Sequence, residues 1–329
     1  MQSSPVAGNR SHPLRAAVVG LGLIGGSLLR ALAAGGHDVT GFDADPRTRE
    51  LARAAGHRVA DSVTDAVRGA EVTALAVPLQ FLPQVLPQLA GHDGLVTDVT
   101  SVKGPVRELA AAHGLRRFVG GHPMAGKETS GFAASDPDLF SGCAWVLCLE
   151  PETDLGDWLA LARLYTELGA RVVPVTAVEH DTAVAQISHV PHLFAAALAG
   201  QLAGHPLAAA LAAGSFRDGT RVAATRAELI AAMCGGNVDA VRGELRSLIG
   251  VLREMSDLLD SDDPVTALVP ALRTAGDLRR SWPATPGEAE ELTASVGSLL
   301  ELGRSGGWVT AVHDGEVLAM RPGSDRKAS

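Results

Sequence analysis

The chain has 329 residues, of which 46% are hydrophobic, so it has room for two domains and can bury a sizeable core. Its formal net charge is −9 and it carries no clustered basic tract, which argues against nucleic acid as a partner. Three cysteines without a CxxC pair argue against a disulfide framework or a zinc site, and we expect a cytoplasmic protein.

Residues 1–13 are polar and lack the apolar core of a signal peptide, so we expect a disordered lead-in there. Residues 14–176 alternate strand and helix patterns, beginning with a strand at residues 16–19, a helix from about Gly25 and the strand "HDVTGFD". Further strand candidates are "EVTALAVP", "GLVTDVT", "RRFVGGHP", "CAWVLCLE" and "ARVVPVT". This order predicts an α/β domain with a doubly wound, mostly parallel sheet that ends near Thr176.

Residues 177–283 show helical spacing of Ala, Leu, Arg and Glu without a convincing strand, so we expect an all-α domain. Its apolar stretch at residues 193–214 is interrupted by Gln201, His205 and Pro206, which favours a buried helix pair over a membrane span. Helices this apolar also predict a homodimer through this domain.

Residues 284–329 form a small appendix that is too short to be a full regulatory domain of its own. "GEAEELTASVGSLLELGRSGG" resembles a helix, and "WVTAVHDGEVLAM" resembles a hairpin that turns at Asp314 and Gly315.

A G-x-G-x-x-G pattern runs from Gly20 to Gly25, between the first strand and the first helix. In a dinucleotide site Gly20 makes the tight turn, Gly22 lets the backbone approach a pyrophosphate, and Gly25 lets the helix pack on the strand. Asp43 ends the next strand and would bind the adenosine ribose and repel a 2′-phosphate, which favours NAD. The expected cofactor residues are Gly20, Gly22, Leu23, Ile24, Gly25, Asp43, Val77 and Pro78.

Other ligands remain compatible with this loop. Arg47 could pair with a 2′-phosphate, so NADP stays open, and flavin shares the same fingerprint. A glycine-rich turn that binds nothing is the remaining alternative.

The stretch "GGHPMAGKETSGF" sets His122 among small residues, directly after the strand candidate "RRFVG". Ligands bind at the carboxyl edge of open parallel sheets, and the small neighbours suggest that a ligand comes close to the imidazole. "DVTSVKG" brings Ser101 and Lys103 to the same edge. The alternatives are a loop histidine bonded to backbone for His122 and a helix N-cap for Ser101.

"ISHVPH" places His189 and His192 three residues apart, on one face of a helix that the proline between them must bend. A third metal ligand at recognisable spacing is missing, so no metal site is expected. In "FRDGTRVA", Arg217 and Asp218 can form a surface ion pair. Arg221 is the better candidate for a carboxylate clamp, because a guanidinium binds a carboxylate through two parallel hydrogen bonds.

Five motifs resemble the prephenate dehydrogenase family in order and spacing, over roughly residues 14–240. They are "VVGLGLIGGSL", "DVTSVKG", "GGHPMAGKETSGF", "ISHVPH" and "FRDGTRVA", of which HPMAG and SHxPH are specific and the glycine loop is not. The resemblance implies a Rossmann-type domain followed by an all-α dimerisation domain. It also implies NAD(P)-dependent oxidative decarboxylation of prephenate, or of the similar arogenate, in tyrosine biosynthesis.

By motif position, the resemblance implies that His122 is the catalytic base and hydrogen-bonds the ring hydroxyl, with Ser101 as its partner near the nicotinamide. It implies that Glu128 and His192 lie in the substrate pocket and that Arg221 binds a substrate carboxylate. The chain departs from the family in "RAELIAAMCGGN", which lacks the tryptophan that many relatives carry, although its last residue, Asn237, fits the pattern. The motifs therefore do not decide between prephenate and arogenate.

Two other functions stay open on the sequence alone. A two-domain β-hydroxy acid dehydrogenase has the same layout but usually relies on a lysine in the helical domain. This chain has no lysine between Lys127 and Lys327, so the helical domain expected at residues 177–283 lacks one. A non-catalytic protein that senses NAD or assists assembly could share the fold, but it would not need His122, Ser101 and Arg221 together.

Overall fold

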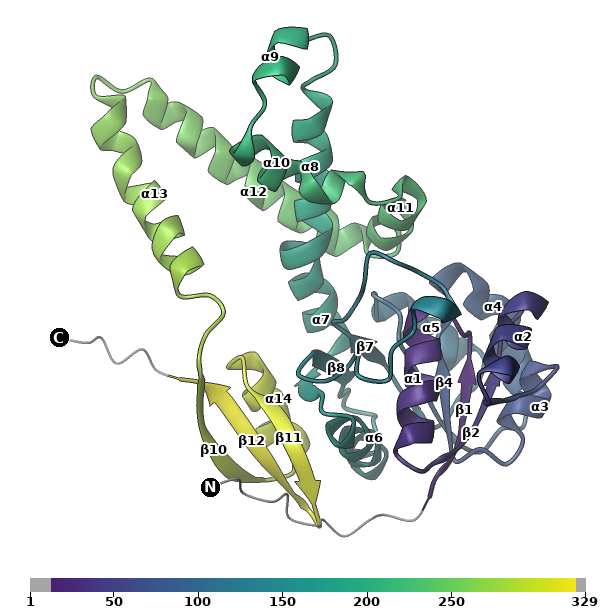
Figure 1. Cartoon of the computed structure of the whole chain (residues 1–329). Coiled ribbons are helices and arrows are strands. Elements are labelled where there is room, and N and C mark those ends of the chain that lie inside the picture. The colour runs from purple at the N-terminus through teal and green to yellow at the C-terminus, as the bar shows by residue number, and fades with distance from the viewer. Residues whose placement is uncertain (1–12, 324–329) are drawn as a thin grey trace, which may run out of the picture. The chain divides into compact units, whose positions relative to one another are not determined.

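The computed structural model describes residues 13–323, which form two compact units (Figure 1). The first unit comprises residues 13–100, 109–145 and 156–171, and the second comprises residues 101–108, 146–155 and 172–323. The lead-in expected at residues 1–13 falls, except for its last residue, outside the described part of the chain.

The first unit contains a six-stranded parallel sheet in the order β3-β2-β1-β4-β5-β6. Its strands are β1 (Arg15–Val19), β2 (Asp38–Phe42), β3 (Arg58–Val59), β4 (Val72–Leu75), β5 (Leu95–Asp98) and β6 (Phe118–Val119). β1, β4 and β5 are buried along almost their whole length, as expected of strands covered on both faces. The strand order reverses between β1 and β4, and open α/β sheets bind ligands at the carboxyl ends of strands at such a point.

Helices connect these strands. They are α1 (Leu23–Ala34), α2 (Pro46–Ala54), α3 (Val63–Val67), α4 (Leu82–Val85) and α5 (Gly104–Ala112), and α6 (Leu155–Glu167) follows. Asp45 caps the start of α2 and Ser62 caps the start of α3, because each of these side chains accepts a hydrogen bond from an amide in the first turn. Right-handed crossovers put α1 and the β4–β5 connection on opposite faces of the sheet. The prediction of a doubly wound α/β fold is confirmed.

Three further strands lie at the predicted places but outside the parallel sheet. They are β7 (Gly121–Pro123), β8 (Ala144–Cys148) and β9 (Arg171–Val175). The Met124 amide, directly after β7, donates to the Ala144 carbonyl at 2.8 Å, and the Arg171 amide donates to the Cys143 carbonyl at 2.8 Å. The prediction of one sheet continuing to Thr176 is therefore wrong, because an apolar run identifies a strand but not the strand beside it.

The second unit is helical from residue 177 to residue 280, as predicted. It contains α7 (Ala177–Val184), a π-helical turn (Ala185–His189), α8 (Val190–Gly200), α9 (Pro206–Leu211), α10 (Gly214–Thr220), α11 (Ala227–Gly235), α12 (Val238–Leu259) and α13 (Pro264–Arg280). Thr176 and Glu179 form a reciprocal capping box that starts α7. A core of Ala185, Val190 and Val241 joins the π-helical turn, α8 and α12.

The apolar stretch at residues 193–214 is not the buried helix pair that we expected. α9 has no buried residue, and Leu207 and Leu211 are 71% and 72% exposed in the single chain. No helix among residues 13–323 is long and apolar enough to cross a membrane.

The C-terminal appendix is a strand, a helix and a hairpin: β10 (Pro286–Thr293), α14 (Val296–Arg304), β11 (Trp308–His313) and β12 (Glu316–Pro322) (Figure 1). The hairpin turns at Asp314 and Gly315 as predicted. The helix expected from Gly287 is wrong in its first half, because that segment pairs antiparallel with β12. The helix begins only after Ser295, whose side chain caps it. Pairing between distant segments overrides the weak helix preference of a glutamate-rich run.

Candidate active site

The glycine loop follows β1 and leads into α1. Gly20 and Gly25 lack a side chain for reasons that the structure shows. Gly20 has φ +97°, a conformation that favours glycine. A Cβ on Gly20 would overlap the Ala76 carbonyl oxygen and lie 2.9 Å from Val77 Cγ1. A Cβ on Gly25 would overlap the Gly20 carbonyl oxygen and lie 2.7 Å from Ala76 Cβ. The loop can therefore press α1 against the end of β4 only because these two residues lack side chains.

Gly22 differs from its neighbours, because a Cβ added there would meet nothing within 4 Å. It is the N-cap residue of α1, and the first amides of a helix have no partner within the helix. Leu23 and Ile24 supply two of these amides and are only partly buried. An open backbone face beside free helix amides is the arrangement that holds a pyrophosphate, so the residues present fit a dinucleotide.

Asp43 lies directly after β2 and contacts the glycine loop. Its Oδ2 accepts a hydrogen bond from the Leu21 amide at 2.6 Å, and its Oδ1 accepts one from the Asp45 amide at 2.9 Å. These bonds fix the carboxylate beside the loop and leave lone pairs free for a ribose hydroxyl.

Two arginines follow Asp43 and differ in their contacts. Arg49 donates through Nη1 to the Asp43 carbonyl at 2.7 Å and lies over the Phe42 ring. The Arg47 side chain is exposed and forms no hydrogen bond or ion pair within the described residues. Arg47 is therefore the guanidinium still available to a 2′-phosphate.

Val77 and Pro78 follow β4, at the same carboxyl edge as the glycine loop. Val77 is partly buried, and its Cγ1 would lie 2.9 Å from a Cβ added to Gly20. Pro78 is exposed. All eight expected cofactor residues thus lie on the segments that follow β1, β2 and β4 or on the start of α1.

His122 is the central residue of β7 and is partly buried. Its neighbour Gly121 donates its amide to Oδ1 of Asp98 at 3.0 Å, and Asp98 is the last residue of β5. This bond brings β7 to the carboxyl end of β5. His122 therefore lies on a segment held at the carboxyl edge of the parallel sheet, as the sequence predicted.

Two of the small residues near His122, Gly121 and Gly126, differ in what surrounds them. A Cβ on Gly121 would lie 2.7 Å from the Asp98 carbonyl oxygen and 3.2 Å from Trp145 Nε1, so this glycine makes room for protein and not for a ligand. Our interpretation of the motif is wrong at Gly121, which is buried against β5 and β8. The same interpretation is still possible for Gly126, where an added Cβ would meet nothing within 4 Å.

Glu128 lies in the exposed loop that follows β7. The far end of this loop is attached to α1: the Asp136 amide donates to Ser27 Oγ at 2.9 Å, and Arg30 Nε donates to Ser135 Oγ at 2.7 Å. The far end of the loop that carries Glu128 is therefore held against α1.

Ser101 and Lys103 lie in the second unit, before α5. Ser101 is partly buried, and Lys103 is only 1% exposed. The amides of Lys103 and Gly104 donate to the two carboxylate oxygens of Asp181, each at 2.8 Å. Asp181, and not the Ser101 hydroxyl, accepts these hydrogen bonds from the start of α5.

Asp181 belongs to a buried polar network. Burial opposes its ionisation, but hydrogen bonds from His180, at 2.8 Å, and from the Gly104 and Lys103 amides outweigh it and lower the pKa of this carboxyl. Asn237 Nδ2 donates to the Asp181 carbonyl at 2.7 Å and lies 3.3 Å from His189 Nδ1.

The two histidines of the SHxPH motif are in different environments. His189 is 1% exposed, and burial lowers its pKa to about 4, so its imidazole is neutral. His192 is partly buried, and its Nδ1 lies 2.8 Å from the Ser188 carbonyl. A proton on Nδ1 satisfies that carbonyl and leaves Nε2 of His192 as an acceptor.

Arg221 follows α10 and is exposed. The ion pair that we considered between Arg217 and Asp218 does not form, and Arg221 likewise has no acidic partner within residues 13–323. Its guanidinium is thus uncommitted.

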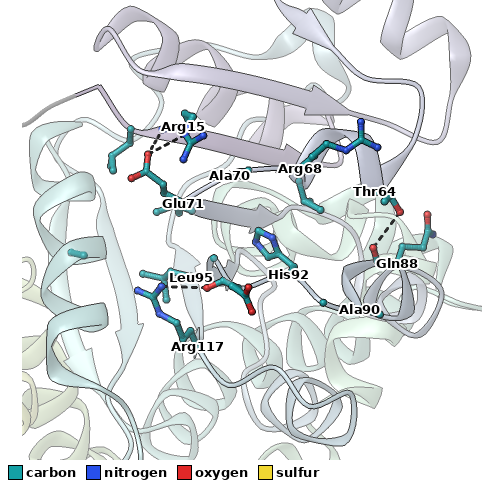
Figure 2. A pocket seen from close by; sticks show the side chains of 18 residues that line it. Arg15, Thr64, Arg68, Ala70, Glu71, Gln88, Ala90, His92, Leu95 and Arg117 are labelled. Atoms are coloured by element: carbon teal, nitrogen blue, oxygen red, sulfur yellow. Dashed lines mark hydrogen bonds and ion pairs between the residues drawn. The ribbon is translucent and has the colours of Figure 1, made fainter.

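A cavity of about 660 Å³ in the first unit lies at the amino ends of the parallel strands, opposite their carboxyl ends (Figure 2). Its lining includes Arg15 and Leu95, which begin β1 and β5, together with Glu71, His92 and Arg117. Arg15 pairs with Glu71, and Arg117 pairs with Asp157. This cavity is therefore separate from the carboxyl edge that carries the glycine loop and His122.

Comparison with known proteins identifies two family domains. The model described as "Prephenate dehydrogenase, nucleotide-binding domain" matches residues 28–174, and "Prephenate dehydrogenase, dimerization domain" matches residues 176–274. A prephenate dehydrogenase of Lactococcus lactis subsp. cremoris is 36% identical over 222 residues, which are 63% of this chain and 60% of that protein. The match thus spans less than two thirds of that relative.

Two solved structures resemble the chain over most of their length. Arogenate dehydrogenase of Synechocystis is 31% identical, with a TM-score of 0.74 over 82% of this chain and 100% of that one. Prephenate dehydrogenase of A. aeolicus, in complex with hydroxyphenyl propionate and NAD+, is 26% identical, with a TM-score of 0.76 over 83% and 99%. The chain belongs to the prephenate dehydrogenase family.

Proposed function

We propose that this chain catalyses the NAD-dependent oxidative decarboxylation of prephenate to 4-hydroxyphenylpyruvate, a step of tyrosine biosynthesis. The observation that carries the proposal is that the glycine loop after β1 and the His122 segment beside β5 lie at one edge of one sheet. Abstraction of hydride from a hydroxyl-bearing carbon needs a dinucleotide and a base at one place. The names of the relatives support the same chemistry.

The reaction assigns a definite task to His122. NAD+, when bound, supplies the acceptor for the hydride of the ring carbon that bears the hydroxyl group. His122 accepts a hydrogen bond from that hydroxyl and draws off its proton as the carbon moves toward a carbonyl. The carboxylate on the opposite ring carbon leaves as carbon dioxide, the ring becomes aromatic, and His122 returns the proton to the phenolic oxygen. The imidazole must be neutral to begin this cycle.

The remaining residues bind and orient the substrate in this proposal. Ser101 is the proposed partner of His122 near the nicotinamide. Glu128 and His192 line the substrate pocket, and the free Nε2 of His192 supports this role. Arg221 holds the ring carboxylate, which its exposed and unpaired guanidinium supports.

NAD is the proposed cofactor in preference to NADP. The carboxylate of Asp43 is held beside the glycine loop by the Leu21 amide, where it would accept hydrogen bonds from the ribose and repel a 2′-phosphate. The exposed side chain of Arg47 opposes this preference, so it is the residue to change if NADP proves to be used.

The proposal includes a homodimer formed through the second unit and a cytoplasmic location, the latter resting on the sequence alone. Exposed apolar side chains on α9, α11, α12 and α13 support the dimer; they include Leu207, Leu211, Leu229, Val251, Leu252, Leu272 and Leu278. A monomer mass by light scattering at micromolar concentration would contradict it.

The experiment that tests the function measures NADH formation at 340 nm with prephenate, arogenate and a panel of β-hydroxy acids. Turnover with prephenate and NAD+ supports the proposal. Faster turnover with arogenate would transfer the same mechanism to the amino acid substrate, which the Synechocystis relative makes the second candidate. Turnover of a β-hydroxy acid alone would overturn the proposal, and NAD+ binding without any turnover would indicate a non-catalytic protein.

A further inference from the structure

Asp98 is a fully buried carboxylate at the end of β5, next to the proposed active site. Its Oδ1 accepts the Gly121 amide at 3.0 Å. Its Oδ2 accepts the Thr100 amide at 2.9 Å and also the Thr100 hydroxyl. Thr100 directly precedes Ser101, and Gly121 directly precedes His122. One side chain therefore holds the backbone immediately before both residues that we propose for catalysis.

We propose that Asp98 is a positioning residue of this enzyme, which fixes the backbone from which His122 and Ser101 project. This inference rests on the proposed function. It adds to the reaction a residue that touches neither substrate nor cofactor.

The chemistry of the side chain explains why an acid stands here. Donors from Gly121 and Thr100 approach both oxygens of Asp98, so each oxygen must accept. An asparagine has the same shape, but it would turn an NH2 group toward either the Gly121 amide or the Thr100 donors. A buried carboxylate is costly unless it is hydrogen-bonded, so these bonds both require Asp98 and hold it in place.

Buried side chains also pack closely against β7 at Gly121. A Cβ on Gly121 would lie 3.1 Å from Thr97 Oγ1 and 3.2 Å from Trp145 Nε1. Trp145 is fully buried and stacks on Tyr165, with 3.8 Å between ring centroids and 15° between planes. The backbone at Gly121 is thus hydrogen-bonded to a buried carboxylate and lies close to a buried pair of stacked rings. Catalysis is sensitive to such placement, because a displacement of about 1 Å can cost roughly 10²-fold in rate.

The test compares Asp98→Asn with Asp157→Asn. Asp157 is a matched control, because it is a buried acid of the same unit, 8% exposed and paired with Arg117. We expect Asp98→Asn to lower kcat for prephenate by roughly 10–10²-fold while the Kd for NAD+ changes less than about twofold. We expect Asp157→Asn to retain kcat within about twofold. Equal kcat in the two variants would overturn the proposal.

A double-mutant cycle with His122→Asn separates positioning from a general loss of folded protein. If Asp98 acts through His122, Asp98→Asn lowers kcat further by less than about twofold once His122 is replaced. The same fold-loss in both backgrounds would show that Asp98 does not act through His122.

Two variants of Thr100 test the same hydrogen bonds without changing Asp98. Thr100→Val removes the hydroxyl donor, and Thr100→Ser keeps it. We expect the valine variant to lose kcat several-fold and the serine variant to retain it, and equal activity in the two would contradict the proposal. A wild-type protein that forms no NADH from prephenate would instead refute the proposed function, whatever the variants do.

Discussion

The glycine loop allows a sharp prediction, because two of its glycines lack a side chain for opposite reasons. In Gly25→Ala the new Cβ would overlap the Gly20 carbonyl oxygen and lie 2.7 Å from Ala76 Cβ. Carbon atoms pack at about 3.5–4.0 Å, so α1 would have to move roughly 1 Å away from β4. In Gly22→Ala the new Cβ would meet nothing within 4 Å.

The expected costs follow from this difference. Overpacking typically costs about 1–3 kcal/mol, and Gly25→Ala belongs at the upper end because the obstacle is backbone. At about 2–4 °C per kcal/mol for a domain of this size, the melting temperature should fall by roughly 6–12 °C. Gly22→Ala should melt within about 3 °C of wild type but bind NAD+ at least about 10-fold more weakly, because its methyl group occupies the space proposed for the pyrophosphate.

Thermal unfolding followed by circular dichroism and NAD+ titration of intrinsic fluorescence measure the two effects separately. Wild-type stability of Gly25→Ala would refute the packing argument. Wild-type NAD+ affinity of Gly22→Ala would refute the assignment of the loop to the pyrophosphate.

Three further predictions concern charged and titratable side chains. Arg221→Ala should lower kcat/KM for prephenate and arogenate alike, by an amount equivalent to a few kcal/mol of binding free energy, and Arg221→Lys should restore it in part. Unequal losses for the two substrates would mean that Arg221 contacts the substrate side chain. Asp43→Ser should narrow the preference for NAD+ over NADP+, measured as a ratio of kcat/KM values, and a wild type that prefers NADP+ would mean that Arg47 dominates. Burial lowers the pKa of His189 to about 4, below its unfolded value of about 6.5, so the unfolded state binds the proton more tightly and stability falls as the pH is lowered. Urea unfolding should show about 2 kcal/mol lost between pH 7 and pH 5 from this group, a loss absent in His189→Gln.

Local signals made much of the first unit predictable. The buried runs of β1, β4 and β5 are short and continuous, and the glycine pattern lies between a strand and a helix. Each of these features depends on residues close together in the chain, which is why the sheet and the position of the glycine loop could be predicted from sequence.

The sequence patterns did not predict features that depend on residues far apart in the chain or outside it. β10 is a strand because it pairs with β12, although its glutamates alone favour a helix. α9 is apolar in composition but exposed in the single chain, and a partner outside one chain leaves no local signal in the sequence.

The same limit applies to the site. His122 stands in a specific motif, so its place at the sheet edge could be anticipated. The role of Asp98 could not, because its partner Gly121 lies 23 residues away, although Asp98 itself opens the quoted motif "DVTSVKG". The bond from the Lys103 amide to Asp181 spans 78 residues and leaves no trace in local sequence.

In the proposed mechanism His122 is the base of an oxidative decarboxylation. Its most direct test measures carbon dioxide and NADH formed from prephenate by wild type and by His122→Asn, which keeps some hydrogen bonding but removes the base. We expect one carbon dioxide per NADH in wild type, and a fall of both rates by about 10²–10⁴-fold in the variant with NAD+ affinity unchanged. Near-normal turnover by purified His122→Asn, or NADH formation without carbon dioxide, would contradict it.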